Sequence, residues 1–552
     1  MKRSGASIII EALCRNHAET VFGYPGGAVL PIYDELYRNA FRIKNILCAH
    51  EQNAAHAADG FARVSGRPGV VIATSGPGAT NLVTGIANAY LDSVPMVVLT
   101  GNVAVPLLGR DSFQEVDIVS VTQGIVKHSF SVGDVRELDG VIDAAFRIAS
   151  SGRHGPVLID IPKSIQTDVC EDGDHRAETV FEKRVPSPDV SAAVRAIRAA
   201  ERPLIYAGGG VAASGAEAQL VRFAEKISAP VAFSLMGLTS MPAGAPGNLG
   251  MCGMHGTLRS ALVHRECDLI VAVGVRFSDR ATGDVSRYRN GKTIVHIDID
   301  AAEIGKNAAV DIELCGDAKE VLNALIAALP DGDRPAWRER VAELCAMDAE
   351  TDDGGKLTPK NLIRTVAGTC SPDTIVVTDV GQHQMWTAQY YPFVRPRTFL
   401  TSGGLGTMGF GLGAAVGGCI ARGGKRTVLF TGDGSFGMCL QELATAVTYD
   451  LPLLIVILNN GVLGMVRQWQ TMFYGRRYSA TTLARKTDFP ALARAFGATG
   501  ECVDTLAGLR SALKSLPASG PVVLDCRIDK DEFVLPMIPP GGSVGNIVTR
   551  KE

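Results

Sequence analysis

The chain has 552 residues, of which 46% are apolar and 20% charged, and its formal net charge is −3. That length predicts about three or four domains. The small net charge gives no electrostatic basis for binding nucleic acid or an anionic membrane, and no apolar stretch has the length of a bilayer span. The 12 cysteines form no CxxC pair, and Glu11 interrupts the apolar patch after the basic N-terminus. We therefore expect a cytoplasmic protein with reduced thiols and no signal peptide.

Short apolar runs alternate with helical segments along the whole chain. This pattern predicts an α/β fold of three domains, each an open, mostly parallel sheet flanked by helices. The expected domains cover 1–170, 190–330 and 358–535, followed by a tail at 536–552, with polar linkers at 171–191 and 330–359. The expected buried strands are 70–74, 96–100, 157–161, 204–207, 269–273, 294–299, 375–378, 427–431, 453–458 and 522–526.

Two polar residues follow consecutive buried strands in the third domain. Asp433 stands in a Gly-Asp-Gly-Ser turn after the strand at 427–431, and Asn460 follows the strand at 453–458, with a helix expected over 441–450. Parallel neighbouring strands would bring both side chains to one C-terminal sheet edge, where ligands of open α/β sheets bind. Since Mg²⁺ prefers oxygen ligands together with phosphate oxygens, the pair predicts a magnesium–pyrophosphate site.

Two other interpretations of this region stay open from the residues alone. Asp and Gly are common turn formers, so a lone Gly-Asp-Gly is more often an ordinary turn. The segment 404–409 also fits GxGxxG, with Asp433 beyond it, as in a dinucleotide-binding fingerprint. Only Phe399 and Leu400 precede these glycines as an apolar lead-in, and Asp433 does not end a strand, so the nicotinamide interpretation is the weaker one.

Glu51 in the first domain offers acid–base chemistry that would complement this socket. The pairing of Asp433 with Asn460 resembles the thiamine diphosphate (ThDP) motif, and that cofactor needs a buried carboxyl to share a proton with its aminopyrimidine. Glu51 opens an alanine-rich helix after an apolar run. Its simpler role is a favourable partner of the helix dipole. The glycine-rich segments 24–28 and 75–81 could approach a ring closely, but ordinary tight turns explain them equally well.

Longer motifs cover most of the chain, from about residue 9 to about residue 547. Together they resemble the large catalytic subunit of biosynthetic acetolactate synthase (acetohydroxyacid synthase), a ThDP-dependent family. The motifs are FGYPGG at 22–27, HEQ at 50–52, TSGPGATN at 74–81, FQE at 113–115, GMHG at 253–256, VGQHQMW at 380–386 and GMVRQWQ at 464–470.

The resemblance implies a ThDP site with Glu51 and Gln114 as catalytic residues. It implies Mg²⁺ on the side chains of Asp433 and Asn460 and the carbonyl of Val462. Further ThDP contacts are implied at Pro77, Asn81, Gly381, Gln382, His383, Gly406, Met408, Gly434, Ser435 and Met465. Among these, Met408 would support the bent cofactor.

The resemblance also implies FAD in the central domain, in a structural rather than a redox role. The glycines after the strand at 204–207 are by themselves only a weak phosphate-loop signal. The residues that would hold FAD are Arg153, Gly208, Gly209, Gly210, Met254, His255, Arg276, Asp298 and Asp317.

Substrate selection is implied at Phe113, Arg280 and Trp469, with Met254 and Met465 beside them. An arginine fork suits the carboxylate of a 2-ketoacid. A tryptophan wall can favour a slightly larger acceptor, since burying one extra methylene is worth about 0.8 kcal/mol.

The family's reaction decarboxylates pyruvate and ligates the remaining two-carbon unit to pyruvate or 2-ketobutyrate. The products, 2-acetolactate and 2-aceto-2-hydroxybutyrate, serve the biosynthesis of valine, leucine and isoleucine. The resemblance implies a homodimer or dimer of dimers, in which Glu51 acts on ThDP held by the partner, and a separate small regulatory subunit. Alternatives are a pyruvate oxidase, a glyoxylate carboligase, or a cofactor-binding partner protein without turnover.

Overall fold

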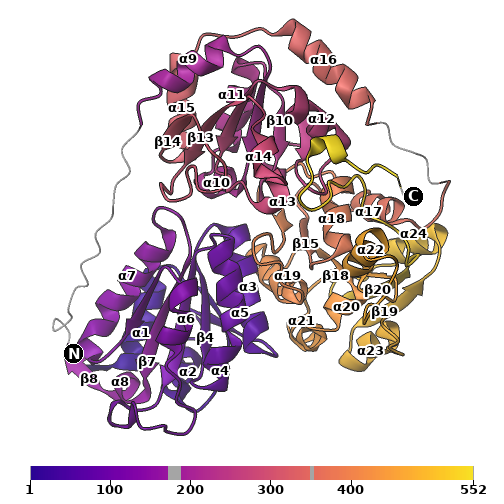
Figure 1. Ribbon diagram of the computed structural model, residues 1–552. Coiled ribbons are helices and arrows are strands. Elements are labelled where there is room, and N and C mark those ends of the chain that lie inside the picture. The colour runs from indigo at the N-terminus through magenta and orange to yellow at the C-terminus, as the bar shows by residue number, and fades with distance from the viewer. Residues whose placement is uncertain (1, 172–187, 349–353, 551–552) are drawn as a thin grey trace.

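Three six-stranded parallel sheets, each covered by helices, make up most of the molecule (Figure 1). The computed structural model describes residues 2–171, 188–348 and 354–550. The expected α/β class with three sheets is confirmed. The expected buried strands all form, with ends that differ by at most two residues. Parts of the two expected linkers, 172–187 and 349–353, lie outside the described residues.

The first domain is a sheet in the order β3-β2-β4-β5-β7-β6. Its strands are β2 (Thr20–Tyr24), β3 (Lys44–Leu47), β4 (Gly69–Ala73), β5 (Met96–Asn102), β6 (His128–Ser131) and β7 (Pro156–Pro162), and a small ribbon pairs β1 (Lys2–Ser4) with β8 (Val169–Glu171). Its helices are α1 (Gly5–Arg15), α2 (Leu30–Arg38), α3 (Glu51–Ser65), α4 (Pro77–Asn81), α5 (Val83–Leu91), α6 (Ile118–Thr122), α7 (Leu138–Ser150) and α8 (Lys163–Thr167), with short 3₁₀ turns η1 (Val105–Leu107), η2 (Gln123–Ile125) and η3 (Val135–Glu137).

The central domain has the order β11-β10-β9-β12-β13-β14. Its strands are β9 (Pro203–Ala207), β10 (Val231–Phe233), β11 (Asn248–Met251), β12 (Leu269–Val273), β13 (Thr293–Asp298) and β14 (Ile312–Cys315). Its helices are α9 (Ser191–Ala199), α10 (Gly209–Ser214), α11 (Glu217–Lys226), η4 (Leu235–Ser240), α12 (Leu258–Glu266), α13 (Asp279–Thr282), α14 (Val285–Tyr288), α15 (Ala318–Ala328) and α16 (Pro335–Ala346).

The third domain has the order β16-β15-β17-β18-β20-β19, which numbered along the chain repeats the arrangement of the first domain. Its strands are β15 (Ile375–Thr378), β16 (Phe399–Leu400), β17 (Thr427–Gly432), β18 (Leu453–Asn459), β19 (Thr499–Val503) and β20 (Val522–Arg527). Its helices are α17 (Pro359–Ala367), α18 (Gln382–Tyr390), α19 (Phe410–Ala421), α20 (Asp433–Phe436), η5 (Leu440–Glu442), α21 (Leu443–Thr448), α22 (Gly464–Phe473), α23 (Phe489–Phe496) and α24 (Leu506–Lys514), and η6 (Val544–Asn546) lies in the tail.

Two helix predictions differ from the structure. The helix expected over 441–450 begins as the 3₁₀ turn η5 and becomes α-helical only in α21. The segment 330–359, predicted as a linker, contains helix α16. Trp337, Val341 and Leu344 are buried on α16, and this helical spacing of apolar residues outweighs the turn-forming Asp and Gly residues around it.

The first and third domains meet along α3 and α19, whose backbones nearly touch. A Cβ built on Gly417 would lie 1.8 Å from the carbonyl oxygen of Ala57, and one built on Gly60 would lie 2.3 Å from that of Ala414. Only glycine allows so close an approach. The seam formed by these residues fixes how the two sheets face each other.

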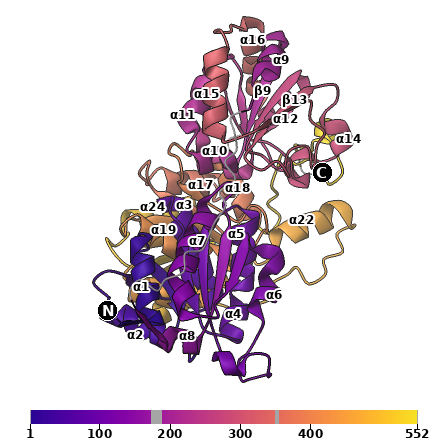
Figure 2. The ribbon, with the colours of Figure 1, turned by 90° about the vertical axis from the view of Figure 1, so that its left-hand side faces the viewer.

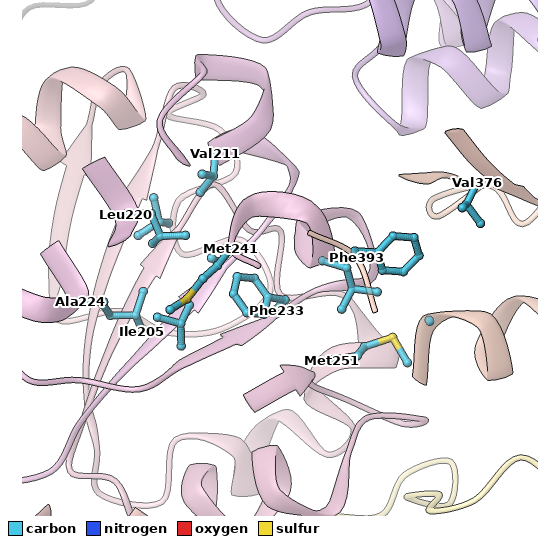
Figure 3. Packing of buried hydrophobic residues seen from close by; sticks show 14 of the residues in the cluster. Ile205, Val211, Leu220, Ala224, Phe233, Met241, Met251, Val376 and Phe393 are labelled. Atoms are coloured by element: carbon cyan, nitrogen blue, oxygen red, sulfur yellow. The ribbon is translucent and has the colours of Figure 1, made fainter. Parts of the chain in front are cut away.

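The central and third domains share an apolar core. Phe393 and Val376 of the third domain belong to the same buried cluster as Phe233 and Met251 of the central domain (Figure 3). Beyond β20 the chain returns to the central domain, where Ile538 N–H donates to the carbonyl of Met254 at 2.8 Å. Helices long and apolar enough to cross a membrane do not occur in the described part of the chain.

Candidate active site

The sheets of the first and third domains each have a point where the strand order reverses. It lies between β2 and β4 in the first domain and between β15 and β17 in the third. Ligands of open α/β sheets bind at such points, beyond the carboxyl ends of the strands. The segments 24–28 and 75–81 follow β2 and β4, while Gly381 and Asp433 follow β15 and β17.

Asp433 and Asn460 follow neighbouring parallel strands, as the sequence predicts. Gly432 of β17 is in register with Leu458 of β18. Asp433 is 7% exposed, and burial raises the pKa of its carboxyl to about 6. Asn460 accepts a hydrogen bond from Val462 N–H at 3.2 Å through its side-chain oxygen.

Gln382 connects this pair to the first turn of α18. Its amide oxygen accepts a hydrogen bond from Asn460 Nδ2 at 3.3 Å, and its amide nitrogen donates to Gln468 Oε1 at 3.0 Å. Gln468 in turn donates to the carbonyl of Val534 at 3.1 Å. These bonds hold the ends of β15 and β18 in one rigid arrangement.

His383 is a buried, neutral histidine beside two glycines. Burial lowers its pKa to about 3. A Cβ on Gly432 would lie 3.0 Å from His383 Nδ1, and one on Gly381, whose φ is +152°, would lie 2.9 Å from Cε1 of the same ring. The buried Nε2 atom has no hydrogen-bond partner among the described residues, so it can serve a ligand.

Met408 lies on the loop between β16 and α19, next to the Asp433 turn. A Cβ on Gly434 would lie 3.8 Å from Met408 Cε, whereas one on Gly406 would meet nothing within 4 Å. The two-residue strand β16 is an edge strand, so the glycines at 404–409 do not follow a central strand as a dinucleotide fingerprint requires. Ser435 at the same turn donates to the carbonyl of Val380 at 2.9 Å.

Glu51 is the first residue of α3 and is 9% exposed. Asn81 Nδ2 donates to Glu51 Oε2 at 3.0 Å, and a Cβ on Gly78 would lie 3.3 Å from Glu51 Oε1. Pro77 begins the short helix α4 that carries Gly78 and Asn81. The glycine-rich turn thus meets the carboxylate directly.

Gln114 lies against the same turn, on the loop that joins β5 to α6. A Cβ on Gly76 would lie 2.9 Å from Gln114 Cα, and Gln114 has a φ of +60°. Its neighbour Phe113 is 88% exposed. No ring contact joins Phe113 to the other expected substrate residues in the described part of the chain.

Arg280 and Trp469 come together across the central and third domains. The Arg280 guanidinium lies 5.4 Å from the centre of the Trp469 ring, and its Nη1 lies 3.6 Å from Met254 Sδ. Figure 2 shows α22, which carries Trp469 and Met465, below α14 and the C-terminal tail. Trp469 Nε1 is buried and has no hydrogen-bond partner among the described residues.

The central sheet has the strand order of dinucleotide-binding folds, with its reversal between β9 and β12. Gly208, Gly209 and Gly210 follow β9 directly. A Cβ on Gly208 would lie 2.2 Å from the carbonyl oxygen of Gly274, so the loops after β9 and β12 approach each other as closely as backbones can.

The other residues expected at FAD border the same edge. Arg276 follows β12, Asp298 ends β13, and Asp317 follows β14. Burial raises the pKa of Asp298 to about 6, whereas Asp317 already caps α15 and accepts from Ser214 Oγ at 2.8 Å. Arg153 reaches across from the first domain and pairs with Glu303 at 2.8 Å. His255 is buried, and burial lowers its pKa to about 4.

Family models match all three domains. The thiamine pyrophosphate enzyme N-terminal TPP binding domain matches residues 3–121, the central domain 190–325, and the C-terminal TPP binding domain 379–526. The chain is 44% identical to a probable acetolactate synthase large subunit of Methanocaldococcus jannaschii, covering 99% of this chain and 95% of the relative. It is 44% identical to the acetolactate synthase isozyme 2 large subunit of Escherichia coli, covering 98% of each, and 42% identical to isozyme 3, covering 98% and 97%.

The chain belongs to the acetolactate synthase large-subunit family. The first and third domains are therefore its ThDP-binding domains. The residues of the third domain suit this cofactor: Asp433 supplies a buried carboxylate, His383 offers a ring nitrogen without a partner among the described residues, and Gly406 leaves open space beside its backbone. A Mg²⁺ ion would suit Asp433 and Asn460, since both offer oxygen ligands.

Two residues at this site were not predicted from the sequence. Asp379, directly after β15, is fully buried and accepts from the N–H groups of Gly409 and Gly411 at 2.8 and 3.2 Å. Gln468 links Gln382 to the C-terminal segment. A carboxylate directly after a buried strand was a usable signal for Asp379, but the pairing of two distant glutamines leaves no trace in a single sequence.

Proposed function

We propose that the chain is the catalytic subunit of an acetolactate synthase. It would decarboxylate pyruvate and ligate the two-carbon unit to pyruvate or 2-ketobutyrate. The observation that carries the proposal is the placement of Glu51 at the C-terminal sheet edge of one ThDP-binding domain and of Asp433 with Asn460 at that of the other. The family membership supports the choice of reaction.

When bound, ThDP supplies a carbon nucleophile and an electron sink for decarboxylation. Glu51 would share a proton with the aminopyrimidine, and Asn81 orients the carboxylate by its hydrogen bond at 3.0 Å. Gln114, which packs on Gly76 beside this turn, would contact the reacting groups. Met408 would support the cofactor from the third domain.

Asp433, Asn460 and the carbonyl of Val462 would hold Mg²⁺ on the diphosphate, with Gln382 and His383 at the phosphate oxygens. A cation would offset the cost of the buried Asp433 carboxylate, whose pKa burial raises. The remaining expected contacts follow the carboxyl ends of β15, β17 and β4: Gly381, Gly434, Ser435 and Pro77.

FAD would lie at the strand reversal of the central sheet, against Gly208, Gly209 and Gly210. Arg276 and Arg153 carry positive charge toward that edge, where a pyrophosphate would need it. Nothing in the proposed reaction requires the flavin to change oxidation state. A structural role for FAD is therefore consistent with the proposed reaction.

Arg280 would grip the carboxylate of the second ketoacid, with Trp469 and Phe113 as the apolar wall. Because Trp469 lies against Arg280, both can touch one small acceptor. Trp469→Leu is expected to reduce the preference for 2-ketobutyrate over pyruvate about fourfold, the equivalent of one buried methylene. Competition between the two acceptors measures this ratio.

The reaction is tested with purified protein, ThDP, Mg²⁺, FAD and pyruvate. We expect acetolactate, and with 2-ketobutyrate present also 2-aceto-2-hydroxybutyrate. Stoichiometric reduction of FAD would identify a pyruvate oxidase instead, and turnover of glyoxylate alone a glyoxylate carboligase. Protein that holds the cofactors without forming product would refute the proposal.

We further propose a homodimer, or a dimer of dimers, in which each site combines Glu51 of one chain with Asp433 of the other. Apolar side chains exposed in both ThDP-binding domains support it: Tyr24, Leu30, Phe113, Leu405 and Met438. Mixing inactive Glu51→Gln and Asp433→Ala proteins under exchange should restore activity, since a mixed dimer has one site with both residues intact. No restoration, in a mixture shown to contain mixed dimers, would place both residues in one chain.

The relatives are named large subunits, so a small regulatory subunit is part of the proposal. A change in activity on adding such a subunit would support it. The free cysteines among the described residues fit a reducing compartment, and we propose a cytoplasmic location on that ground.

A further inference from the structure

The loop at 401–411 carries Gly406 and Met408 to the proposed cofactor, and it is held from two domains. At its centre Gly406 has a φ of +73° and open space where a Cβ would be, and Leu405 is 40% exposed. The residues on either side of this centre are held by hydrogen bonds. The open centre of the loop is thus fixed by its two ends.

Two side chains of the first domain hold the loop on both sides of Gly406. Asp92, just beyond α5, accepts the backbone N–H groups of Gly403 at 3.0 Å and Gly404 at 2.6 Å. Asn88 Oδ1 accepts the hydroxyl of Ser402 at 2.6 Å and that of Thr407 at 3.2 Å. Residues far from the loop in sequence therefore set its position.

Arg63 of α3 holds these two anchors in place. Its guanidinium pairs with Asp92 at 2.9 Å and with Asp59 at 2.5 Å, and it donates to the carbonyl of Thr401 at 3.1 Å. Asp59 also accepts from Asn88 Nδ2 at 3.1 Å. Burying such charges costs free energy that apolar packing would not, so a role in geometry explains them better than a role in stability.

The third domain holds the loop on both sides of Gly406 as well. Asp379 accepts the N–H groups of Gly409 and Gly411, and Gln384 donates to the carbonyl of Ser402 at 3.0 Å. Hydrogen bonds from both ThDP-binding domains therefore hold the segment that carries Met408. A shift of the first domain would therefore displace Met408.

We propose that Asn88 and Asp92, supported by Arg63, are positioning residues that set the Gly406–Met408 segment against the cofactor. They touch neither substrate nor cofactor and act through the loop. This inference rests on the proposed function. It adds a connection within one chain, whereas the proposed dimer connects two chains.

Asp92→Asn tests the proposal, because an amide keeps only one acceptor oxygen for two backbone N–H groups and removes the charge facing Arg63. The matched control is Asp268→Asn in the central domain, whose carboxylate likewise accepts two consecutive N–H groups, those of Glu201 and Arg202, each at 2.9 Å. Both variants are compared with wild type as the full protein loaded with ThDP and Mg²⁺.

For Asp92→Asn we expect kcat to fall about tenfold, with the KM for pyruvate changed less than about twofold, because misplacement near reacting groups acts on the chemical step. Exchange of the cofactor's C2 proton with deuterium should slow in parallel, and the circular-dichroism band of bound ThDP should change. Asp268→Asn should lower the melting temperature without moving these readouts. Wild-type kcat, proton exchange and dichroism in folded Asp92→Asn would overturn the inference.

A milder pair of variants covers the case in which Asp92→Asn does not fold. Thr407→Val removes one hydroxyl from Asn88 and should slow C2 exchange about threefold, whereas Thr407→Ser keeps the hydroxyl and should restore it. Equal exchange in both would overturn the inference. A wild-type protein that binds no ThDP would refute the proposed function itself, which separates the two failures.

Discussion

The two halves of the proposed ThDP site differ in how far one chain completes them. In the third domain Asp433, His383 and Gln382 are buried, and Gln382 is hydrogen-bonded to Asn460 after β18 and to Gln468 of α22. In the first domain Glu51 is buried, but Phe113, the neighbour of Gln114 in the chain, is 88% exposed. The site residues of the third domain are thus held by hydrogen bonds within the chain, whereas the loop that carries Gln114 in the first domain leaves its aromatic side chain exposed.

This difference is not a difference of fold. Both sheets have the same strand order, and both halves use the point where that order reverses. What differs is the content of the loops after equivalent strands: a carboxylate and amide for a metal in one, and a glycine-rich turn against a glutamate in the other. One architecture therefore serves two ends of one cofactor.

Glu51→Gln should have the largest effect on activity, and it changes the first-domain half of the proposed site. The amide keeps the size and the contact with Asn81 but cannot exchange the proton, so kcat should fall at least about 100-fold while ThDP affinity stays within a few-fold. Steady-state kinetics and calorimetric titration measure the two quantities. Glu313→Gln, on an exposed position of β14, is the control and should match wild type.

Asp433→Asn should break the other half and act on binding instead. Losing the carboxylate should weaken apparent Mg²⁺ affinity about tenfold or more, and chelation of the metal should release ThDP from wild type as well. Titrating Mg²⁺ at fixed ThDP measures this, with exposed Asp450→Asn as the control. If excess Mg²⁺ fails to recover any activity, Asp433 does more than bind the metal.

The sequence alone predicted most of what lies within one domain. The strands and the meeting of Asp433 with Asn460 follow from apolar runs and parallel pairing, which are local rules. Helix α16 was overlooked because turn residues surround it. The anchoring of the 401–411 loop by Asn88 and Asp92 could not be predicted, since it depends on how two domains pack and no local pattern encodes that.

Gly417→Ala should loosen the seam that joins the two halves within the chain. The added methyl would lie 1.8 Å from the Ala57 carbonyl oxygen, so α3 and α19 must separate. We expect a loss of about 1–3 kcal/mol in the free energy of unfolding, measured by denaturant or thermal unfolding. Gly124→Ala, where a Cβ meets nothing within 4 Å, should change stability little. Equal stability of both variants would mean that the seam is adaptable.

The smallest expected effect is the difference between asparagine substitutions at two buried carboxylates, one in each ThDP-binding domain. Burial raises the pKa of Asp160 and of Asp379 to about 6. Asp160 is held by side chains, the Thr100 hydroxyl at 2.8 Å and Asn102 Nδ2 at 2.6 Å, whereas Asp379 is held by backbone N–H groups. Asparagine should be tolerated at Asp160, because the Thr100 hydroxyl can accept a hydrogen bond from the new amide instead of donating one. It should not be tolerated at Asp379, because backbone N–H groups can only donate.

The pH dependence of stability tests the raised pKa of these two carboxyl groups. Because the folded pKa of Asp160, about 6, lies above the ordinary value of an aspartate, folding favours the protonated form, and wild type loses stability as the pH rises from about 4 through about 6. Asp160→Asn has no such loss, so its melting temperature should gain on wild type by the equivalent of about 1 kcal/mol between pH 5 and pH 8. Asp379→Asn should gain on wild type in the same way, because the pKa of Asp379 is raised as well. It should nevertheless lie about 1–3 kcal/mol below Asp160→Asn at both pH values, since it leaves a buried N–H unpaired. A constant difference between Asp160→Asn and wild type would show that Asp160 keeps an ordinary pKa in the folded protein.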